Sequence, residues 1–343
     1  MHKQFRRTAK IALVLVYLVI AAGAIVRMTG SGMGCPDWPK CFGHYIPPTH
    51  ISELQWKAET EIKKGQVIIV DETLQVAVKD FRTAASYNEN NWKTYTKHDY
   101  AEFNVSHTWV EYVNRLFGAL AGFATLILAL LSFSSFRKNK ILTILSWLVV
   151  FGMGFQAWLG ATVVYSVLEP VKITAHMIMA LVIVALLLYI IHLTRKTVVS
   201  RDSKNIIPLL GIVLFATLVQ IILGTQVRQF VDERIDTLGE TANSLWLANV
   251  NWEFYAHRSF SILVVILNIL LALRIHKSNF DLTKMNWVLV LLFFEIISGV
   301  VMYYFDFPFA TQSIHLILAT LIFGVQFYLV LEATSSRKRH KSL

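Results

Sequence analysis

Charged residues are scarce in this sequence. Of its 343 residues only 16% are Asp, Glu, Lys or Arg, against 55% that are hydrophobic, and the mean hydropathy is +0.53. Soluble globular domains carry about 25% charged residues. The shortage of charge therefore argues against a soluble protein and favours one that lies in a membrane.

Two targeting signals are also missing. A basic N-terminus precedes the apolar segment 11–28, but no small-residue cleavage site follows it. We therefore interpret this segment as a membrane span rather than a signal peptide. The chain shows no Arg- and Ser-rich presequence, which favours the inner (plasma) membrane of a bacterium over the mitochondrial inner membrane.

Apolar runs long enough to cross a bilayer recur along the chain. We predict eight membrane helices, at about 11–28, 109–134, 141–164, 173–193, 206–227, 252–273, 285–305 and 313–332. The predicted fold class is therefore an all-α membrane protein that crosses the bilayer several times.

The net charge of +10 comes largely from basic clusters between the predicted spans. These clusters precede the first span, join every even span to the next odd one, and close the chain. With eight spans they all lie on one side, which the positive-inside rule makes the cytoplasm. Both termini are then cytoplasmic, and the charge indicates orientation in the lipid bilayer rather than nucleic-acid binding.

Short motifs repeat between the two halves of the chain. A polar residue, three further residues and a glycine occur at 156–160, 220–224 and 295–299, and Gly-x-x-x-Arg ends both the first and the fifth span, at 23–27 and 224–228. We therefore predict two tandem, pseudo-symmetric four-helix bundles, residues 1–193 and 206–343, joined by a cytoplasmic linker at 194–205.

Three predicted spans carry a histidine near their outer end: His176, His257 and His315. Imidazoles from facing helices of a bundle can bind a haem iron, although a lone histidine at a helix end more often packs or bonds to backbone. His257 and His315 fall in one half, and the other half supplies His176 at the corresponding place. We predict that His257 and His315 bind one iron and that His176 is the metal ligand of a second site.

The second site differs from the first at one position. When Asn114–Arg115 is aligned with His257–Arg258, asparagine stands where the other half has histidine. Two axial ligands give a haem suited to electron transfer, whereas a missing ligand leaves the iron open, as oxidative chemistry requires. This difference between the two halves therefore favours one electron-transfer site and one reactive site.

Four arginines lie near the predicted outer face: Arg27, Arg115, Arg228 and Arg258. Guanidinium groups pair with carboxylates, so these side chains could neutralise haem propionates. Anchoring to lipid headgroups is an equal alternative. The glycines of the repeated motif could likewise serve helix packing rather than a site.

The first outer loop, at about 30–107, is by far the longest and holds the only two cysteines, Cys35 and Cys41. They are close enough in sequence to form a disulfide, and the outer side is oxidising. The bridge could be redox-active, could shape a lid over the site, or could be a structural staple. Metal binding is less favoured, because only His44 lies nearby. We expect the rest of the loop to form one or two short helices without chemistry.

Together these motifs resemble the haem A synthase family. Arg27–Cys41 is similar to the first outer loop of that family with its cysteine pair. Glu111–Arg115 and Ala256–Arg258 are similar to its Glu-x-x-His-Arg elements, and His176 and His315 fall at its other ligand positions. The resemblance runs over nearly the whole chain.

The resemblance implies an oxidoreductase that converts haem O to haem A. A ring methyl is oxidised to a formyl group by successive hydroxylations, with water as the oxygen source. The C-terminal half would bind a haem b cofactor through His257, His315, Arg228 and Arg258. The N-terminal half would take haem O as substrate near His176, Asn114, Arg115 and Arg27. Glu111 is the expected catalytic residue, which stabilises a cationic intermediate or acts as a base.

One residue departs from the family pattern, because Asn114 stands where the family usually has histidine. Asparagine is a poor iron ligand, so we expect a substrate haem bound on one side by His176, with Asn114 as a polar contact. A replacement ligand is the alternative. His107 lies two turns away, about 10 Å along a helix axis, which is too far unless the haem shifts.

The resemblance also implies partners. They are haem O synthase (protohaem farnesyltransferase), which supplies the substrate, and an unidentified electron acceptor or donor; a homo-oligomer is left open. Two other functions remain as alternatives. A non-enzymatic dihaem cytochrome would transfer electrons without making haem A, and a transporter would use the histidines as a proton relay without haem.

Overall fold

The structure is a computed structural model that describes residues 2–137, 139–195, 205–239, 241–278 and 283–340. Its long helices are α1 (His2–Met28), α2 (Val105–Ser132), α3 (Lys140–Tyr165), α4 (Pro170–Leu193), α5 (Ile207–Leu238), α6 (Trp252–His276), α7 (Thr283–Tyr304) and α8 (Thr311–His340). Eight helices of the described chain are long and apolar enough to cross a membrane, and they match the eight predicted spans. The predicted all-α membrane fold is confirmed.

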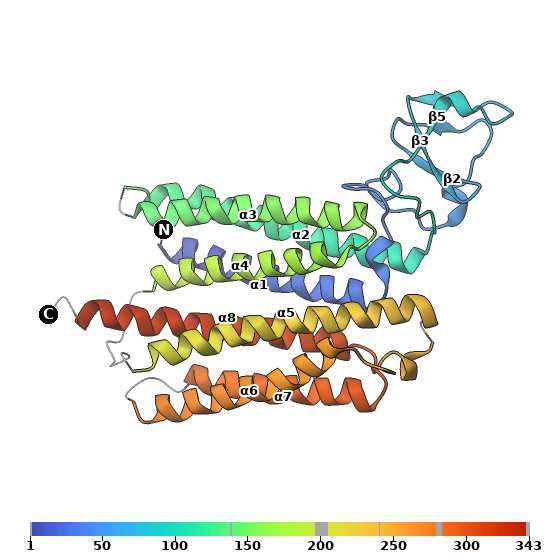
Figure 1. Cartoon of the computed structure of the whole chain (residues 1–343). Coiled ribbons are helices and arrows are strands. Elements are labelled where there is room, and N and C mark those ends of the chain that lie inside the picture. Colours follow the sequence, from blue (N-terminus) through green and yellow to red (C-terminus); the bar gives the residue numbers. More distant parts are fainter. Residues whose placement is uncertain (1, 138, 196–204, 240, 279–282, 341–343) are drawn as a thin grey trace.

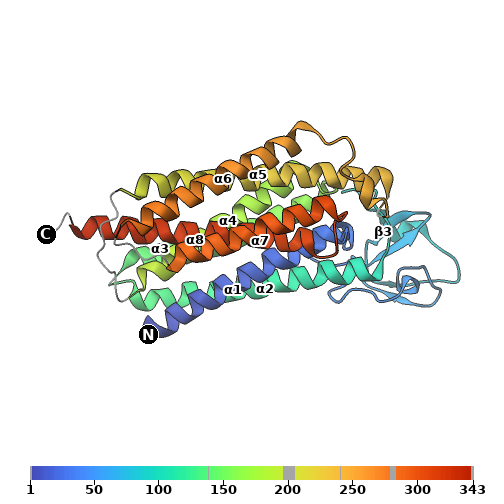
Figure 2. The ribbon, with the colours of Figure 1, turned by 90° about the horizontal axis from the view of Figure 1, so that it is seen from below.

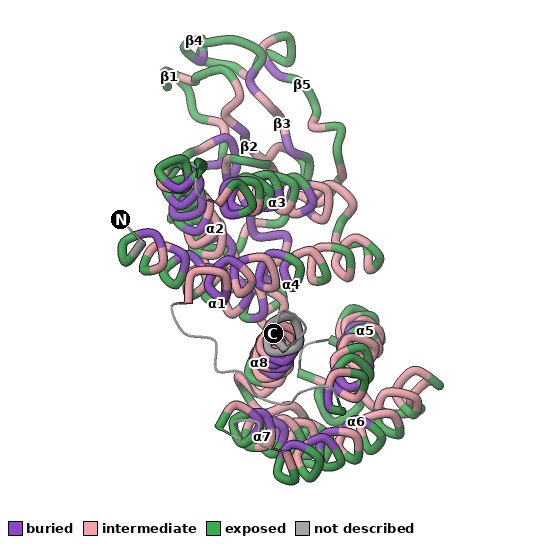
Figure 3. Tube along the Cα trace, turned by 90° about the vertical axis from the view of Figure 1, so that its left-hand side faces the viewer, coloured by how far each residue is buried: buried purple, intermediate pink, exposed green. Residues whose placement is uncertain are grey.

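The two halves of the chain form two similar bundles. In the first, α1 and α3 each pack against α2 and α4, and in the second α5 and α7 each pack against α6 and α8. Contacts of α8 with α1 and α4, and of α5 with α4, join the bundles (Figure 3). Most of the predicted linker, residues 196–204, lies outside the described residues.

Both chain ends lie at one end of the bundles, and residues 30–104 project from the other (Figures 1 and 2). We call the end that carries residues 30–104 the outer end. Apolar cores fill the opposite part of each bundle, around Leu128 and Leu187 in the first and around Leu271 and Met285 in the second. The outer part of each bundle is left for the predicted site residues.

Helix α5 runs further than the sequence predicts. Its apolar stretch ends near residue 227, but the helix continues to Leu238 and stops before Gly239, whose φ of 90° suits glycine. The added turns are polar on one side, and a search for apolar runs cannot find such a segment. This extension brings Asp232 to the outer end of the bundles.

The long outer loop folds into a small cap, and this corrects the sequence prediction. In place of the one or two short helices expected from the sequence, the cap has only single 3-10 turns. It also has five strands, β1 (Glu61–Ile62), β2 (Val67–Val70), β3 (Thr73–Ala77), β4 (Phe81–Arg82) and β5 (Trp92–Thr94). The strands β2, β3 and β5 form one antiparallel sheet, and β1 pairs with β4.

The missed signal lies in the β2–β3 hairpin. Val67–Val70 consists of β-branched residues, which favour strands. The turn residues Asp71 and Glu72 both have positive φ, 47° and 58°, the backbone that a two-residue hairpin loop with the right twist requires. Polar residues on either side disguise this pattern as an ordinary loop.

Candidate functional site

The histidines of the second bundle face each other. His257 on α6 and His315 on α8 have ring centres 6.4 Å apart, with ring planes inclined by 70°. Ser298 Oγ lies 2.8 Å from Nδ1 of His315, and Glu295 Oε1 lies 3.2 Å from its Nε2. The structure therefore brings the two predicted ligands of this half together between their helices.

Each histidine ring lies against a glycine of the repeated motif. A Cβ added at Gly160 would lie 3.3 Å from Cε1 of His176, and one at Gly224 would lie 3.1 Å from Cε1 of His257. At Gly299 the distance to Cε1 of His315 would be 3.5 Å. A side chain at the first two positions would crowd the imidazole. The glycines of the motif therefore make room for the rings.

The polar residue of the same motif contacts the same histidine. Gln156 Nε2 donates to the carbonyl of His176 at 3.0 Å, and Gln220 Nε2 donates to the carbonyl of His257 at 3.1 Å. In the third copy Glu295 reaches the ring of His315 instead. The motif is thus a receptacle for a histidine of the next helix, repeated across both bundles.

Asn114 occupies the fourth equivalent position. A Cβ added at Gly23 on α1 would meet Oδ1 of Asn114 on α2 at 3.9 Å. Gly23 corresponds in the repeat to Gly224, so the structure places Asn114 where the other half has His257. In the first bundle one glycine therefore faces an imidazole, that of His176, and another faces an amide, that of Asn114.

Both sites contain buried polar atoms that lack a hydrogen-bond partner among the described residues. In the first bundle these are Asn114 Oδ1, Gln156 Oε1 and His176 Nδ1; in the second they are Gln220 Oε1, Glu253 Oε2 and Glu295 Oε2. Buried polar groups are normally paired. Their gathering around the histidines is what a site for a bound molecule requires.

The donor set fits an iron porphyrin. Imidazole nitrogens are ligands that a haem iron accepts, and the two rings face one site with centres 6.4 Å apart, although His315 Nδ1 now contacts Ser298 and its Nε2 contacts Glu295. Among the described residues no group of three or more His, Cys, Asp or Glu could hold a bare metal ion. A haem iron would need only two imidazole ligands from the protein, which His257 and His315 would supply.

Two of the four predicted arginines meet on one carboxylate. Arg27 on α1 and Arg228 on α5 bind opposite oxygens of Asp232, with nitrogen–oxygen distances of 2.7 Å and 2.8 Å. Arg258 is exposed and its guanidinium lies 5.4 Å from the centre of the Tyr303 ring. Sequence reasoning missed Asp232, because the acid lies beyond the apolar run of its helix.

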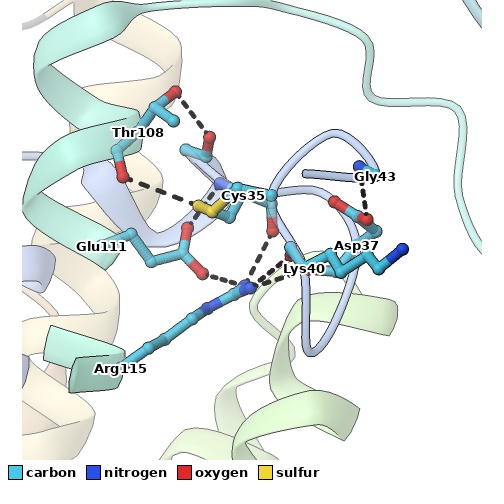
Figure 4. The surroundings of a disulfide bond; sticks show 9 residues. Cys35, Asp37, Lys40, Gly43, Thr108, Glu111 and Arg115 are labelled. Carbon is cyan, nitrogen blue, oxygen red and sulfur yellow. Dashed lines mark hydrogen bonds and ion pairs between the residues drawn. A yellow bond between two sulfur atoms is a disulfide. The ribbon is translucent and has the colours of Figure 1, made fainter. Parts of the chain in front are cut away.

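Glu111 and Arg115 are joined to the cysteine loop (Figure 4). Glu111 is buried, with 4% of its surface exposed, and its Oε1 accepts from Arg115 Nη2 at 2.5 Å. Its Oε2 accepts from the backbone N–H of Cys35 at 2.7 Å. Arg115 also donates to the carbonyls of Cys35, Asp37 and Lys40 at 2.8–2.9 Å. The predicted catalytic carboxylate is therefore fixed against the outer loop.

The predicted disulfide between Cys35 and Cys41 is present, and the loop it closes is held from two sides. On the helix side Gly34 touches α2, where an added Cβ would lie 2.4 Å from the carbonyl of His107, so only glycine fits. On the cap side Tyr95 OH and His98 Nε2 lie 3.3 Å and 2.8 Å from the carbonyl oxygen of Pro36. The sequence gives no signal for the latter two contacts.

In the described part of the chain, eight helices long and apolar enough to cross a membrane, together with a repeated histidine receptacle, define a multi-pass membrane protein built on an internal repeat. The profile of the cytochrome oxidase assembly protein family, COX15-CtaA, matches residues 6–327, so the chain belongs to that family. The resemblance drawn from the motifs is confirmed.

Curated relatives of this chain carry the name "Heme A synthase". The protein of Wolbachia sp. subsp. Brugia malayi is 23% identical over 338 residues, which cover 91% of each chain. That of Flavobacterium johnsoniae is 22% identical over 346 residues, 92% of this chain and 93% of the relative. That of Shewanella oneidensis is 27% identical over 218 residues, which are 63% of this chain and 54% of the relative.

Proposed function

We propose that this protein is a haem A synthase, an oxidoreductase of haem A biosynthesis that converts the ring methyl of haem O to a formyl group. Family membership and the name of the curated relatives support the pathway. The observation that carries the proposal is the pair His257 and His315, with ring centres 6.4 Å apart beside a second receptacle that holds His176 alone.

The two halves have different roles in this proposal. His257 and His315 hold a haem b, which when bound accepts and passes on single electrons. The first half receives haem O beside His176, where Asn114 offers an amide in place of a second imidazole. Arg228 and Arg258 would lie near the cofactor and Arg27 near the substrate. Arg115, which holds the cysteine loop, would act there chiefly as the partner of Glu111.

The reaction sets what Glu111 must do. Converting a methyl group and one water to a formyl group releases four protons and four electrons in total, so the site must move protons and stabilise positive charge. A carboxylate can do both. Arg115 and the Cys35 amide each bind one oxygen of Glu111, which fixes its orientation while the electrons leave to an acceptor.

The protein would work in the inner (plasma) membrane of a bacterium, with both termini in the cytoplasm and the cap outside. Haem O synthase would supply the substrate from the same membrane. The distribution of basic residues supports this orientation. The difference between the two ligand positions, His257 and Asn114, favours one cofactor site and one substrate site over a symmetric dihaem cytochrome.

The decisive experiment is haem extraction from membranes that contain haem O and this protein, followed by pigment analysis. We expect haem A with the wild type and none with Glu111→Gln. His257→Ala should abolish both the haem b spectrum and the product. A wild type that binds haem but leaves haem O unchanged would support the dihaem cytochrome and overturn the proposal.

A further inference from the structure

We infer that Asp232 is a positioning residue shared by the two haem sites, because it holds one arginine of each half and so couples the sites electrostatically. The inference rests on the proposed function, since it concerns a cofactor haem in one half and a substrate haem in the other. Asp232 itself touches neither site histidine in the described structure.

The carboxylate of Asp232 binds one arginine from each bundle. Asp232 Oδ2 accepts from Nη2 and Nε of Arg27 at 2.7 Å and 3.0 Å, and Oδ1 accepts from Nη2 of Arg228 at 2.8 Å. The same Nη2 of Arg228 donates to the carbonyl of Arg27 at 2.9 Å. Helices α1 and α5 are thus joined at the outer end by the ion pair of Arg27 with Asp232 and by the hydrogen bond from Arg228 to the Arg27 carbonyl, whereas the pair of Arg228 with Asp232 lies within α5.

The internal repeat puts these arginines in equivalent places. Arg27 lies one helical turn beyond Gly23, which faces Asn114, and Arg228 lies one turn beyond Gly224, which faces His257. Each arginine therefore lies one helical turn from the glycine that faces residue 114 or residue 257. Asp232 follows one turn later on α5, but the corresponding residue of the first half is Ser31, which lies beyond the end of α1, so both equivalent arginines pair with Asp232.

A free donor points to a further carboxylate near this group. Nη1 of Arg228 is buried and has no hydrogen-bond partner among the described residues. Arginine carries five N–H donors in a rigid fork, and the side chain of Arg228 is only 16% exposed. A haem propionate is the carboxylate that the proposed cofactor would bring, and it would then share Arg228 with Asp232.

This arrangement has an electrostatic consequence. Asp232 offsets two guanidinium charges, and all three side chains are at least two-thirds buried, with exposures of 33%, 22% and 16%. Charges in such a setting are screened less than surface charges. A positive charge near a haem stabilises its reduced form. Removing the carboxylate should therefore raise the midpoint potential of the haem in the second bundle.

The test is a redox titration of the purified full-length protein, read from its haem spectrum without substrate. Asp232→Asn should raise the midpoint potential, and Glu233→Gln is the matched control. Glu233 is the next residue on α5, is exposed, and contacts Gln229 instead. It should leave the potential unchanged. An Asp232→Asn protein that keeps its haem and has the wild-type potential would overturn the inference.

A double-mutant cycle tests the coupling between the halves. Arg27→Gln removes a charge from the first bundle and should lower the potential of the haem in the second. Because Asp232 connects the two arginines, the shifts of Arg27→Gln and Asp232→Asn should not add in the double variant. Additive shifts would overturn the coupling.

The same experiments separate this inference from the proposed function. If Asp232→Asn does not accumulate, Arg27→Gln alone must still shift the potential, and an unchanged value would overturn the inference. A wild type without haem bands would refute the proposed function and the coupling with it. If the wild type binds haem and makes haem A, but both variants have the midpoint potential of the wild type, the coupling alone is refuted.

Discussion

Gly224 on α5 lies directly against the imidazole of His257 on α6. A Cβ at Gly224 would come within 3.1 Å of Cε1 and 3.6 Å of Nδ1 of that ring. Contacts this close force a neighbour to move, and Gln220 one turn earlier already holds the backbone carbonyl of His257. Gly224 therefore fixes where the imidazole can lie.

The first prediction concerns this glycine. Gly224→Ala should displace the His257 ring and reduce the haem bound per protein, because the ring cannot retreat while Gln220 holds its backbone. Gly211→Ala is the matched control, since Gly211 lies on the same helix and nothing stands within 4 Å of an added Cβ there. The measurement is the reduced-minus-oxidised spectrum relative to protein concentration.

The control has its own expectation. Alanine in an open helical position stabilises a helix by up to about 1 kcal/mol over glycine, so Gly211→Ala should keep its haem and unfold no earlier than the wild type. Equal haem content in the two alanine variants would show that Gly224 only packs helices.

The second prediction restores the missing histidine of the first bundle. Asn114 faces Gly23 as His257 faces Gly224, with more room, 3.9 Å against 3.1 Å. Asn114→His should therefore place a second imidazole opposite His176 and convert any haem bound there to the two-ligand, low-spin form. Electron paramagnetic resonance would show a second low-spin signal. Asn114→Gln, which keeps the amide, should show none.

The loss of the open position should also affect turnover. With both axial positions of the substrate iron taken, Asn114→His should make less haem A even though it binds haem O more tightly. An active Asn114→His enzyme with unchanged spectra would mean that residue 114 does not face the iron.

The sequence predicts the spans and the repeat well, because both depend on local patterns. Apolar length marks the eight helices, and the repeated motif marks Gly224 as a recurring position, although only the structure shows that it lies against His257. Contacts between distant segments leave no such pattern. Asp232 meets Arg27 across the two halves, and Pro36 meets His98 across the whole cap. These pairings depend on tertiary folding, so only the structure identifies them.

The third prediction concerns Arg115. Its guanidinium joins the buried Glu111 to three carbonyls of the cysteine loop. Removing one partner of a buried ion pair costs about 3–5 kcal/mol, so Arg115→Ala should loosen the loop and destabilise the protein strongly. Arg115→Lys keeps the charge but cannot reach all four acceptors, and should be intermediate.

The measurement for Arg115 is the rate at which a thiol reductant opens the Cys35–Cys41 bond. The order wild type, Arg115→Lys, Arg115→Ala should run from slowest to fastest. Arg82→Ala is a suitable control, because Arg82 is an exposed arginine of the cap whose Nε donates to the carbonyl of Glu59. Equal rates in all four proteins would refute an anchoring role for Arg115.

The fourth prediction is a pH dependence of the same loop. Burial raises the pKa of Asp37 above the ordinary value of an aspartate, although the hydrogen bond from the Gly43 N–H and the charge of Arg115 oppose the shift. The folded loop therefore binds a proton more readily than the unfolded chain. Protonation of Asp37 therefore stabilises the folded loop. This contribution is present in full below the unfolded-state pKa of Asp37 and is lost as pH rises through its folded-state pKa.

Hydrogen exchange of the backbone at Gly43 would measure this effect. Its N–H donates to Asp37 Oδ2 at 2.8 Å, and its protection factor should fall as pH rises from acid to neutral. Asp37→Asn retains an acceptor oxygen and should remove the pH dependence. Asp71→Asn, in the exposed β2–β3 turn, should leave it intact. A pH dependence that survives in Asp37→Asn would assign it to another group.

The fifth prediction concerns the opposite end of the bundles, where Glu332 on α8 also serves both halves. One carboxylate oxygen pairs with Arg195, two residues beyond the end of α4, and the other lies 3.0 Å from Nζ of Lys284 on α7. Glu332 is 14% exposed, so its pairs are less screened than surface ion pairs. Glu332→Gln should leave two cations unpaired between the bundles and lower the midpoint of thermal unfolding in detergent.

Glu169→Gln is the comparison for Glu332→Gln. Glu169 pairs with Lys172 at 2.8 Å within one half, and both side chains are exposed, 48% and 38%. Such pairs contribute about 0–1 kcal/mol, so this variant should unfold close to the wild type. High salt should narrow the gap between wild type and Glu332→Gln only in part, because partly buried pairs resist screening. If the two variants unfold at the same temperature, Glu332 contributes no more than a surface ion pair, and the contact between the bundles depends on apolar packing alone.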